Sequence, residues 1–236
     1  MSLPKVFVCA PINVRKDYVL DEYFANILKF TYPNKQFFFC DNSPNPKYAT
    51  DKIKQWGFDV EWFNPKGMRN QDYIRDSMNI IRQRFLESDC DYMFNLECDL
   101  LPPPNIIEQL MSWEVQVVSA PYFLGEGAGS FLSNTEIETS FGTIKDNRHL
   151  GWYDGFLDFK AGLIEAQQCG LGCSLITRDV MEQVEFITIH NRPAHHDTYF
   201  YYVLHDLGIK SYWDTSVIVE HKNKSWRLVP DAQQHG

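Results

Sequence analysis

Short apolar runs alternate with segments of helical periodicity over the first 120 residues, and this feature limits the possible folds most strongly. The apolar runs are rich in β-branched and aromatic residues and end at turn residues, as buried strands do. They cover 5–12, 36–41, 58–63, 91–96 and 115–121. Apolar residues recur at helical spacing over 17–30, 47–56, 70–87 and 104–113. This alternation predicts βαβ units and a mainly parallel α/β sheet.

The pattern changes after Pro121. Residues 125–160 are rich in Gly, Ser, Asn and aromatic residues and lack a sustained helical period, which is typical of functional loops or disordered segments. Beyond them the sequence predicts a strand and a helix over 170–186, a helix over 196–208 and two short strands over 210–222. No repeat or linker divides the chain, so we expect one domain over 1–236 with halves 1–121 and 122–236.

Composition and charge argue against several kinds of partner. The 236 residues suffice to bury a core without disulfides or metal. The formal net charge of −9 disfavours electrostatic capture of nucleic acid or of an anionic membrane. No run of about 18 apolar residues occurs, so we expect no membrane span. The N-terminus does not resemble a signal peptide and the six cysteines lie in or beside apolar runs, which favours a cytoplasmic location.

Polar residues end several of the predicted strands. Asp41 follows the second strand, Glu97 and Asp99 follow the fourth, and Glu220 and His221 follow the last. Ligands of parallel α/β sheets bind beyond the carboxyl ends of the strands. Since residues i and i+2 of an extended chain point the same way, Glu97 and Asp99 can address one ion together. Two such carboxylates repel each other unless a cation or a proton intervenes, and Mg²⁺ or Mn²⁺ readily takes carboxylate oxygens.

Each of these residues also has a simpler structural interpretation. Glu97 and Asp99 could be loop acids that cap the helix after the prolines. Asp41 could form the turn "DNSPNP". His221 could be a surface or core histidine. The sequence pattern alone leaves these interpretations open.

The order of the motifs resembles glycosyltransferases of the GT-A fold, and most of all the inverting family 2 enzymes that use nucleotide sugars. In that family the first strand opens the nucleotide site and an acid at the end of the second strand contacts the base. By this resemblance Pro11, Asp41 and Asn42 in "CAPI" and "FFFCDNS" contact the donor. "YIRDSMNII" resembles the family's helix with an Arg-Asn pair, which points to Arg75 and Asn79, although these residues could also form a solvated helix face.

The same resemblance implies a metal centre and a catalytic base. "FNLECDLLPP" is similar to the family's D-x-D motif, with Glu97 in place of the first Asp. Asp99 and His221 would hold Mn²⁺ or Mg²⁺, with Glu97 as a direct or water-mediated ligand or as a donor contact. "HHDTYF" places Asp197 at the position of the base, with His196 where the family has an acid. A helix N-cap is the alternative role for Asp197.

The resemblance implies a metal-dependent hexosyl- or pentosyltransferase. The half 1–121 would bind a nucleotide-diphosphate sugar, and the smaller mixed half 122–236 would bind the acceptor and supply the base for inversion. Two other functions stay open. One is a nucleotidyltransferase, although "APINVRKD" lacks a glycine-rich phosphate loop, and the other is a non-catalytic sugar- or nucleotide-binding module. The acceptor could be a glycan, a protein, a small molecule or a modified base, because the loops 125–168 and 190–196 set it.

Overall fold

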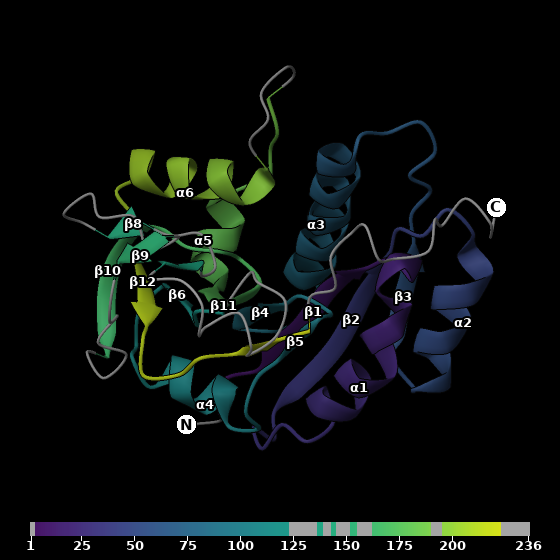
Figure 1. The fold of residues 1–236 in the computed structure, drawn as a ribbon, viewed down its shortest axis with the longest axis horizontal. Coiled ribbons are helices and arrows are strands. Elements are labelled where there is room, and N and C mark those ends of the chain that lie inside the picture. Colours follow the sequence, from purple (N-terminus) through teal and green to yellow (C-terminus); the bar gives the residue numbers. More distant parts are fainter. Residues whose placement is uncertain are drawn as a thin grey trace.

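A mixed sheet between two layers of helices forms the body of the molecule (Figure 1). The computed structural model describes residues 3–122, 136–138, 143–144, 152–154, 162–189 and 195–222. Within them, nine strands pair in the order β3-β2-β1-β4-β11-β6-β12-β10-β8. Their bounds are β1 Val6–Ile12, β2 Lys35–Asp41, β3 Asp59–Trp62, β4 Tyr92–Leu96, β6 Val117–Ser119, β8 Thr143–Ile144, β10 Leu163–Gln168, β11 Cys173–Thr177 and β12 Ser211–Asp214.

Strands β3, β2, β1 and β4 run parallel, and the register of β1 on β2 pairs Ile12 with Asp41. These two strands therefore end side by side, which places the residues that follow them next to each other. Strand β11 enters between β4 and β6 and runs antiparallel to both, while β10 runs against β12 and β8. The predicted α/β class with a mainly parallel sheet is confirmed. The antiparallel β11 joins the two halves of the chain in one sheet.

Alternate residues of the central strands face opposite helix layers, as the pleat of a strand requires. Val6, Val8 and Ala10 of β1 pack beneath one layer, whereas Phe7 and Cys9 face the other. The first layer contains α1 Asp17–Ile27, α2 Pro46–Gln55 and α4 Ile106–Met111. The second contains α3 Asn70–Glu87, α5 Arg178–Gln183 and α6 His196–Asp206 (Figure 1). Burial on both faces explains why these strands read as continuous apolar runs.

Local signals set the helix boundaries. Asn45 caps α2 by accepting a hydrogen bond from the backbone N–H of Lys47 at 3.0 Å, and Pro46 opens the helix. Gly57, with a φ of 80°, lets the chain turn away after α2. The helix expected over 17–30 is shorter, and a 3-10 turn that the sequence pattern did not predict, η1 Val14–Lys16, precedes it.

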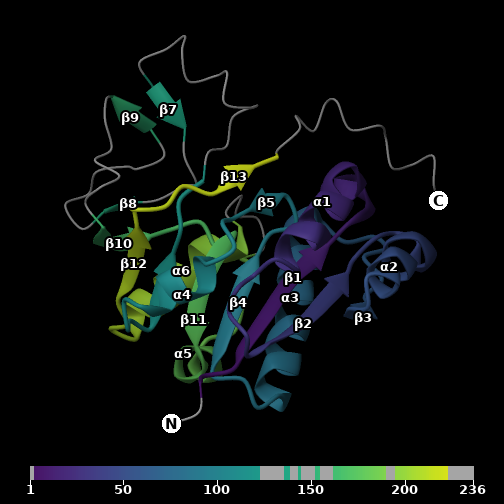
Figure 2. The same ribbon diagram turned by 90° about the horizontal axis from the view of Figure 1, so that it is seen from below.

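A two-stranded ribbon lies beyond the carboxyl ends of β1 and β4 (Figure 2). It consists of β5 Leu100–Leu101 and β13 Glu220–His221, which run antiparallel with His221 opposite Leu100. The backbone N–H of Lys222 adds a hydrogen bond of 2.8 Å to the carbonyl of Asp99. The chain thus does not turn away directly after Asp99, because Leu100 and Leu101 first pair with β13. The ribbon brings His221 to Asp99 across more than a hundred residues of sequence.

Little of the loop 125–160 is described. Strands β7 Glu136–Glu138 and β9 Trp152–Asp154 pair with each other, and β8 joins the edge of the main sheet. The other residues of this loop, and 190–194, lie outside the described residues, and so do the parts of the expected acceptor loops that they form. Among the described helices none is long and apolar enough to cross a membrane.

Candidate active site

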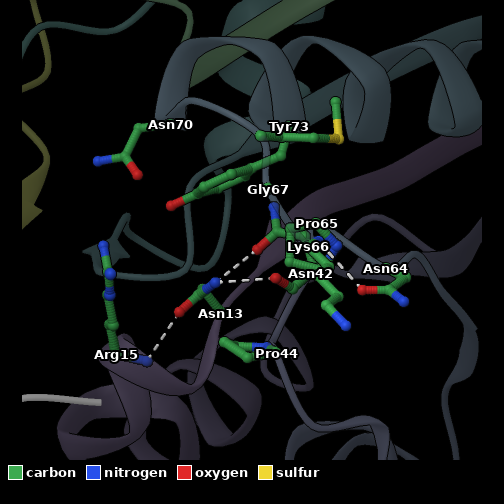
Figure 3. Close-up of a pocket in the computed structure, with 11 residues that line it drawn as sticks. Asn13, Arg15, Asn42, Pro44, Asn64, Pro65, Lys66, Gly67, Asn70 and Tyr73 are labelled. Carbon is green, nitrogen blue, oxygen red and sulfur yellow. Dashed lines mark hydrogen bonds between the residues drawn. The ribbon is translucent and has the colours of Figure 1, made fainter. Parts of the chain in front are cut away.

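A pocket of about 440 Å³ opens beyond the carboxyl ends of β1, β2 and β3 (Figure 3). The turn after β1 forms one side of it, and the first turn of α3 lies opposite. Its wall includes Asn13, Arg15, Asn42, Lys66, Asn70 and Tyr73. No Asp or Glu is among the described residues that line it. Amide groups, an aromatic ring and two cations suit a ligand with a planar polar base and negative charge.

Hydrogen bonds between the ends of β1 and β2 fix this wall. The Asn13 side-chain amide donates to the carbonyl of Asn42 at 3.1 Å and to its Oδ1 at 2.8 Å. Asn13 Oδ1 also accepts from the backbone N–H of Arg15 at 3.0 Å and thereby caps η1. The Val14 N–H donates to Ser43 Oγ at 2.8 Å. Because the two strand ends hold each other, the pocket is preformed.

Asp41 supports the pocket from beneath. Its carboxylate is fully buried and accepts the backbone N–H of Ser43 at 2.9 Å and the Thr50 hydroxyl at 2.7 Å. Burial raises the pKa of this carboxyl group, and the hydrogen bonds from Ser43 and Thr50 oppose that shift. The pocket wall includes Asn42 but neither Asp41 nor Pro11. Asp41 therefore shapes the loop that carries Asn42, much as the turn interpretation of "DNSPNP" expected.

Asp99 is the centre of a buried cluster of charged side chains, which lies at the same end of the parallel strands as the pocket. It is 2% exposed, and its Oδ2 pairs with the ammonium of Lys16 and with His221 Nε2, the latter at 3.1 Å. Burial alone would raise the pKa of Asp99, but the hydrogen bond from His221 and the charge of Lys16 lower it to about 2. Asp99 does not cap α4, whose N-cap is Asn105.

The pKa of Glu97 shifts in the opposite direction from that of Asp99. Burial and then the charge of Asp99 raise its pKa to about 7, which His221 and Lys16 oppose and Asp197 reinforces. Its backbone N–H donates to the Gly172 carbonyl at 2.7 Å, so β11 holds the strand end in place. The Leu100 N–H donates to the Glu97 carbonyl at 3.0 Å and closes a turn, so the two acids do not lie in the extended chain from which their common direction was predicted. Only Asp99 has a cationic partner in contact among the described residues.

Close packing around Gly172 fixes the wall behind these acids. A Cβ atom added there would lie 2.5 Å from the Tyr122 hydroxyl and 2.9 Å from Leu100 Cδ1. The Tyr122 ring in turn meets the edge of the His221 ring, with centroids 5.3 Å apart. A residue larger than glycine would therefore displace Tyr122 or Leu100, and Tyr122 packs on His221.

Asp197 lies in the first turn of α6, one residue after the start of the helix. The N-cap position is His195, so the alternative interpretation of Asp197 as the N-cap residue is wrong. Asp197 Oδ1 accepts the backbone N–H of Thr198 at 2.7 Å, and its charge contributes to the raised pKa of Glu97. Asp197 therefore lies near enough to the acidic centre for its charge to act on Glu97. Its neighbour His196 is buried with Nδ1 unpaired among the described residues, and burial lowers the pKa of its imidazole.

Arg75 and Asn79 lie elsewhere. Arg75 pairs with Asp72 and Asp76 and donates to Thr188 Oγ1 at 2.8 Å. Asn79 donates to the Phe186 carbonyl at 2.8 Å and accepts its N–H at 3.0 Å. These contacts attach α3 to the segment 184–189. The structure brings neither side chain to the pocket wall or into contact with Asp99, and neither belongs to a freely solvated helix face.

The residues expected to bind metal supply part of a metal-binding site. Asp99 Oδ2 and His221 Nε2 lie 3.1 Å apart, so a carboxylate and an imidazole already converge and could both hold a divalent ion. Two carboxylates with an imidazole suit Mn²⁺. In the described part of the chain, no three His, Cys, Asp or Glu side chains converge into a closed site. Glu97 would have to turn, or act through water, to complete the set.

Sequence reasoning missed the basic side of the site. Arg15 and Lys16 follow β1 at its carboxyl end, where the rule that selected Asp41 and Asp99 applies equally. Lys66 and Tyr73 come from the turn after β3 and from the start of α3. A search for polar residues of either charge after each parallel strand would have found "NVRK" and "NPKG".

Comparisons with known proteins identify the fold. No protein-family model and no curated protein matches this sequence. A197 from STIV matches in structure with a TM-score of 0.51 and 16% identity, over 93% of this chain and 86% of that one. GalNAc-T7 with UDP, GalNAc and Mn²⁺ matches with a TM-score of 0.63 and 14% identity, over 93% and 44%. The mannosyltransferase PcManGT from Pyrobaculum calidifontis, in complex with GDP-Man and Mn²⁺, matches at 0.62 and 13%, over 95% and 59%.

These likenesses confirm the GT-A fold that the motif order predicted. The chain spans less than two thirds of the length of GalNAc-T7 and of PcManGT. At this level of identity the comparisons establish the architecture, and the roles of individual residues follow from the chemistry of the site.

Proposed function

We propose that this protein is a divalent-metal-dependent glycosyltransferase that moves a sugar from a nucleotide-diphosphate sugar to an acceptor hydroxyl with inversion. One observation carries the proposal: a pocket with basic residues and a buried Asp99–His221 pair lie at the same sheet edge, joined by η1. Arg15 of this turn lines the pocket, and Lys16 contacts Asp99. Both GalNAc-T7 and PcManGT were solved with a nucleotide or nucleotide sugar and Mn²⁺ on this fold.

The donor's nucleoside would occupy the pocket of about 440 Å³. Asn70 offers an amide to a base edge, and Tyr73 offers a ring face. The buried Asn42 side chain, which bonds to Asn13 and Ser77, supports the wall behind them. The diphosphate would then extend toward η1, where Arg15 and Lys16 supply positive charge. This arrangement orients the bond between the sugar and the diphosphate toward the acids that follow β4.

Asp99 and His221, with Glu97, would hold the metal ion. When bound, a divalent ion stabilises the negative charge that develops on the leaving diphosphate. Lys16 and Arg15 add fixed positive charge beside the same leaving group. The raised pKa of Glu97 fits this role, because a carboxylate crowded by Asp99 binds a cation that relieves their repulsion.

Asp197 would act as the general base. The acceptor oxygen forms a bond to the anomeric carbon on the face opposite the diphosphate, while the bond from that carbon to the phosphate oxygen breaks. The electron pair of the broken bond leaves with the diphosphate, and the hydroxyl proton passes to Asp197. Two observations support this role: Asp197 lies in the first turn of α6, which belongs to the second half of the chain, and its charge acts on Glu97.

Product analysis with two site variants tests the proposal. Wild-type protein, incubated with Mn²⁺ and a panel of nucleotide sugars, should release nucleoside diphosphate by transfer or slow hydrolysis. We expect Asp99→Ala and Asp197→Asn each to lower this rate by about 10²-fold or more while the proteins stay folded. Release of pyrophosphate, or near-normal rates in both variants, would contradict the proposal. Lys210→Met, which removes an exposed ion pair with Glu165, is the control and should keep the wild-type rate.

A further inference from the structure

We infer that Lys16 exchanges between two anions in this site. It neutralises Asp99 in the metal-free protein, and it moves to the donor's diphosphate when a divalent ion takes Asp99. The inference rests on the proposed function, which supplies both the ion and the diphosphate. It assigns Lys16 as a positioning residue that couples metal binding to donor binding.

The ion pair of Lys16 with Asp99 is buried. The Lys16 side chain is 18% exposed and the Asp99 side chain 2% exposed. A buried carboxylate without a compensating partner is strongly destabilising, so the metal-free site needs a cation at this place.

The same position cannot serve Lys16 and a divalent ion together. Both would contact Asp99 Oδ2, which His221 Nε2 already approaches within 3.1 Å. Like charges a few Å apart in a partly buried site repel strongly. A metal ion that binds Asp99 must therefore displace the ammonium group of Lys16.

The displaced side chain has a second anion within reach in the loaded site. Lys16 ends η1, and Arg15 in the same turn lines the pocket proposed for the nucleoside. One turn thus carries both Arg15, which lines the pocket, and Lys16, which contacts Asp99. A donor diphosphate that extends from the pocket toward the acids would bring negative charge beside Lys16. This charge would replace that of Asp99 once Asp99 binds the metal ion.

The exchange makes metal and donor bind cooperatively. Without donor, the metal competes with a resident lysine and binds weakly. With donor, Lys16 gains a new partner, so the competition ends and both ligands bind more tightly, as linkage requires. Removal of the lysine should therefore strengthen metal binding and weaken donor binding, which is a combination that a merely structural residue would not produce.

Electron paramagnetic resonance, which measures free Mn²⁺, tests the inference on the full chain. In the absence of nucleotide, Lys16→Met should bind Mn²⁺ about tenfold or more tightly than wild type. With saturating Mn²⁺, the same variant should bind UDP and GDP about tenfold more weakly, measured by calorimetry, and Lys16→Arg should recover most of that loss. If Lys16→Met fails to fold, Lys16→Gln gives the same comparison.

Lys52→Met is the matched control, because Lys52 is similarly buried, with 15% side-chain exposure, and pairs with Asp17 and Asp21. It should leave both affinities at the wild-type values. Unchanged or weaker Mn²⁺ binding by Lys16→Met, in a protein whose Mn²⁺ binding is lost in Asp99→Asn, would overturn the exchange alone. If Asp99→Asn binds Mn²⁺ like wild type, or no variant binds it at all, the metal centre of the proposed function fails, and the exchange fails with it.

Discussion

Two acids in one short stretch carry opposite electrostatic states at the residue scale. Asp99 is stabilised as an anion by His221 and Lys16, whereas burial and the charge of Asp99 disfavour the anion of Glu97. Their difference arises from partners that come from distant parts of the chain. Asp99 is therefore already ionised, whereas Glu97 can gain or lose a proton near neutral pH. Such a site can accept a cation with little rearrangement of Asp99.

Glu97 should make the metal-free protein less stable as the pH rises. Its folded-state pKa of about 7 lies above the ordinary value of 4.5, so the folded state holds the extra proton between these pH values and stability falls across that window. In the presence of a chelator, Glu97→Gln should therefore raise the free energy of unfolding by about 1–3 kcal/mol more at pH 8 than at pH 4.

Urea unfolding of both proteins at the two pH values measures this difference. Glu185→Gln changes an exposed side chain on the segment before α6 and is the control. Its effect should be the same at both pH values. An equal effect of Glu97→Gln at both pH values would show that Glu97 is not poised in this way.

At the element scale, α3 is joined to the segment that leads into α6. Asn79 makes two hydrogen bonds with the backbone of Phe186, whose side chain is buried and stacks on Phe200 of α6. This contact positions the segment before Asp197, although Asn79 itself touches neither the pocket wall nor the acids. The proposed base thus depends on a helix from the other half of the chain.

Asn79→Ala should destabilise the protein by about 2 kcal/mol or more, since it leaves the Phe186 N–H and carbonyl without their partners. Gln83→Ala on the same helix is the control, because Gln83 is exposed and its side-chain amide contacts Glu87. Its effect should stay within about 0.5 kcal/mol. Equal midpoints for the two variants in denaturant unfolding would contradict the assigned role of Asn79.

Elements were more predictable from the sequence than contacts between them. The helix over 70–87 has the bounds that its apolar spacing predicts, because local periodicity and burial agree there. The place of β11 between β4 and β6, and the pairing of β5 with β13, depend on long-range registers that no local pattern encodes.

The part of the candidate site that could be predicted from the sequence is the set of polar residues directly after the parallel strands. The rule for parallel sheets selected Asp99 after β4, but His221 reaches Asp99 through the separate ribbon of β5 and β13 and not from the end of a strand of the main sheet. It did not reveal that Asp41 is buried, because burial of a turn acid depends on partners such as Thr50. The helix motif that suggested Arg75 matched by residue type, but the direction of a side chain depends on which neighbours pack against the helix.

In the described part of the molecule, helices cover both faces of the sheet and the polar site lies beyond the carboxyl ends of its parallel strands. Both helix layers pack against β1, so polar ligands have access mainly beyond the strand ends. The pocket, which Figure 3 shows, is connected to Asp99 through η1, because Arg15 of this turn lines the pocket and Lys16 pairs with Asp99. This continuity is the reason to expect one extended ligand, a nucleotide joined to a sugar, and not two unrelated small molecules.

A thermal-shift titration with nucleotide-diphosphate sugars, with and without Mn²⁺, tests this account most directly. A ligand that binds only the folded state raises the melting temperature by an amount that follows its affinity. We predict that at least one nucleotide sugar raises it when Mn²⁺ is present, and that Asp99→Asn removes the increase. The same increase without metal, or an undiminished increase in Asp99→Asn, would contradict the account.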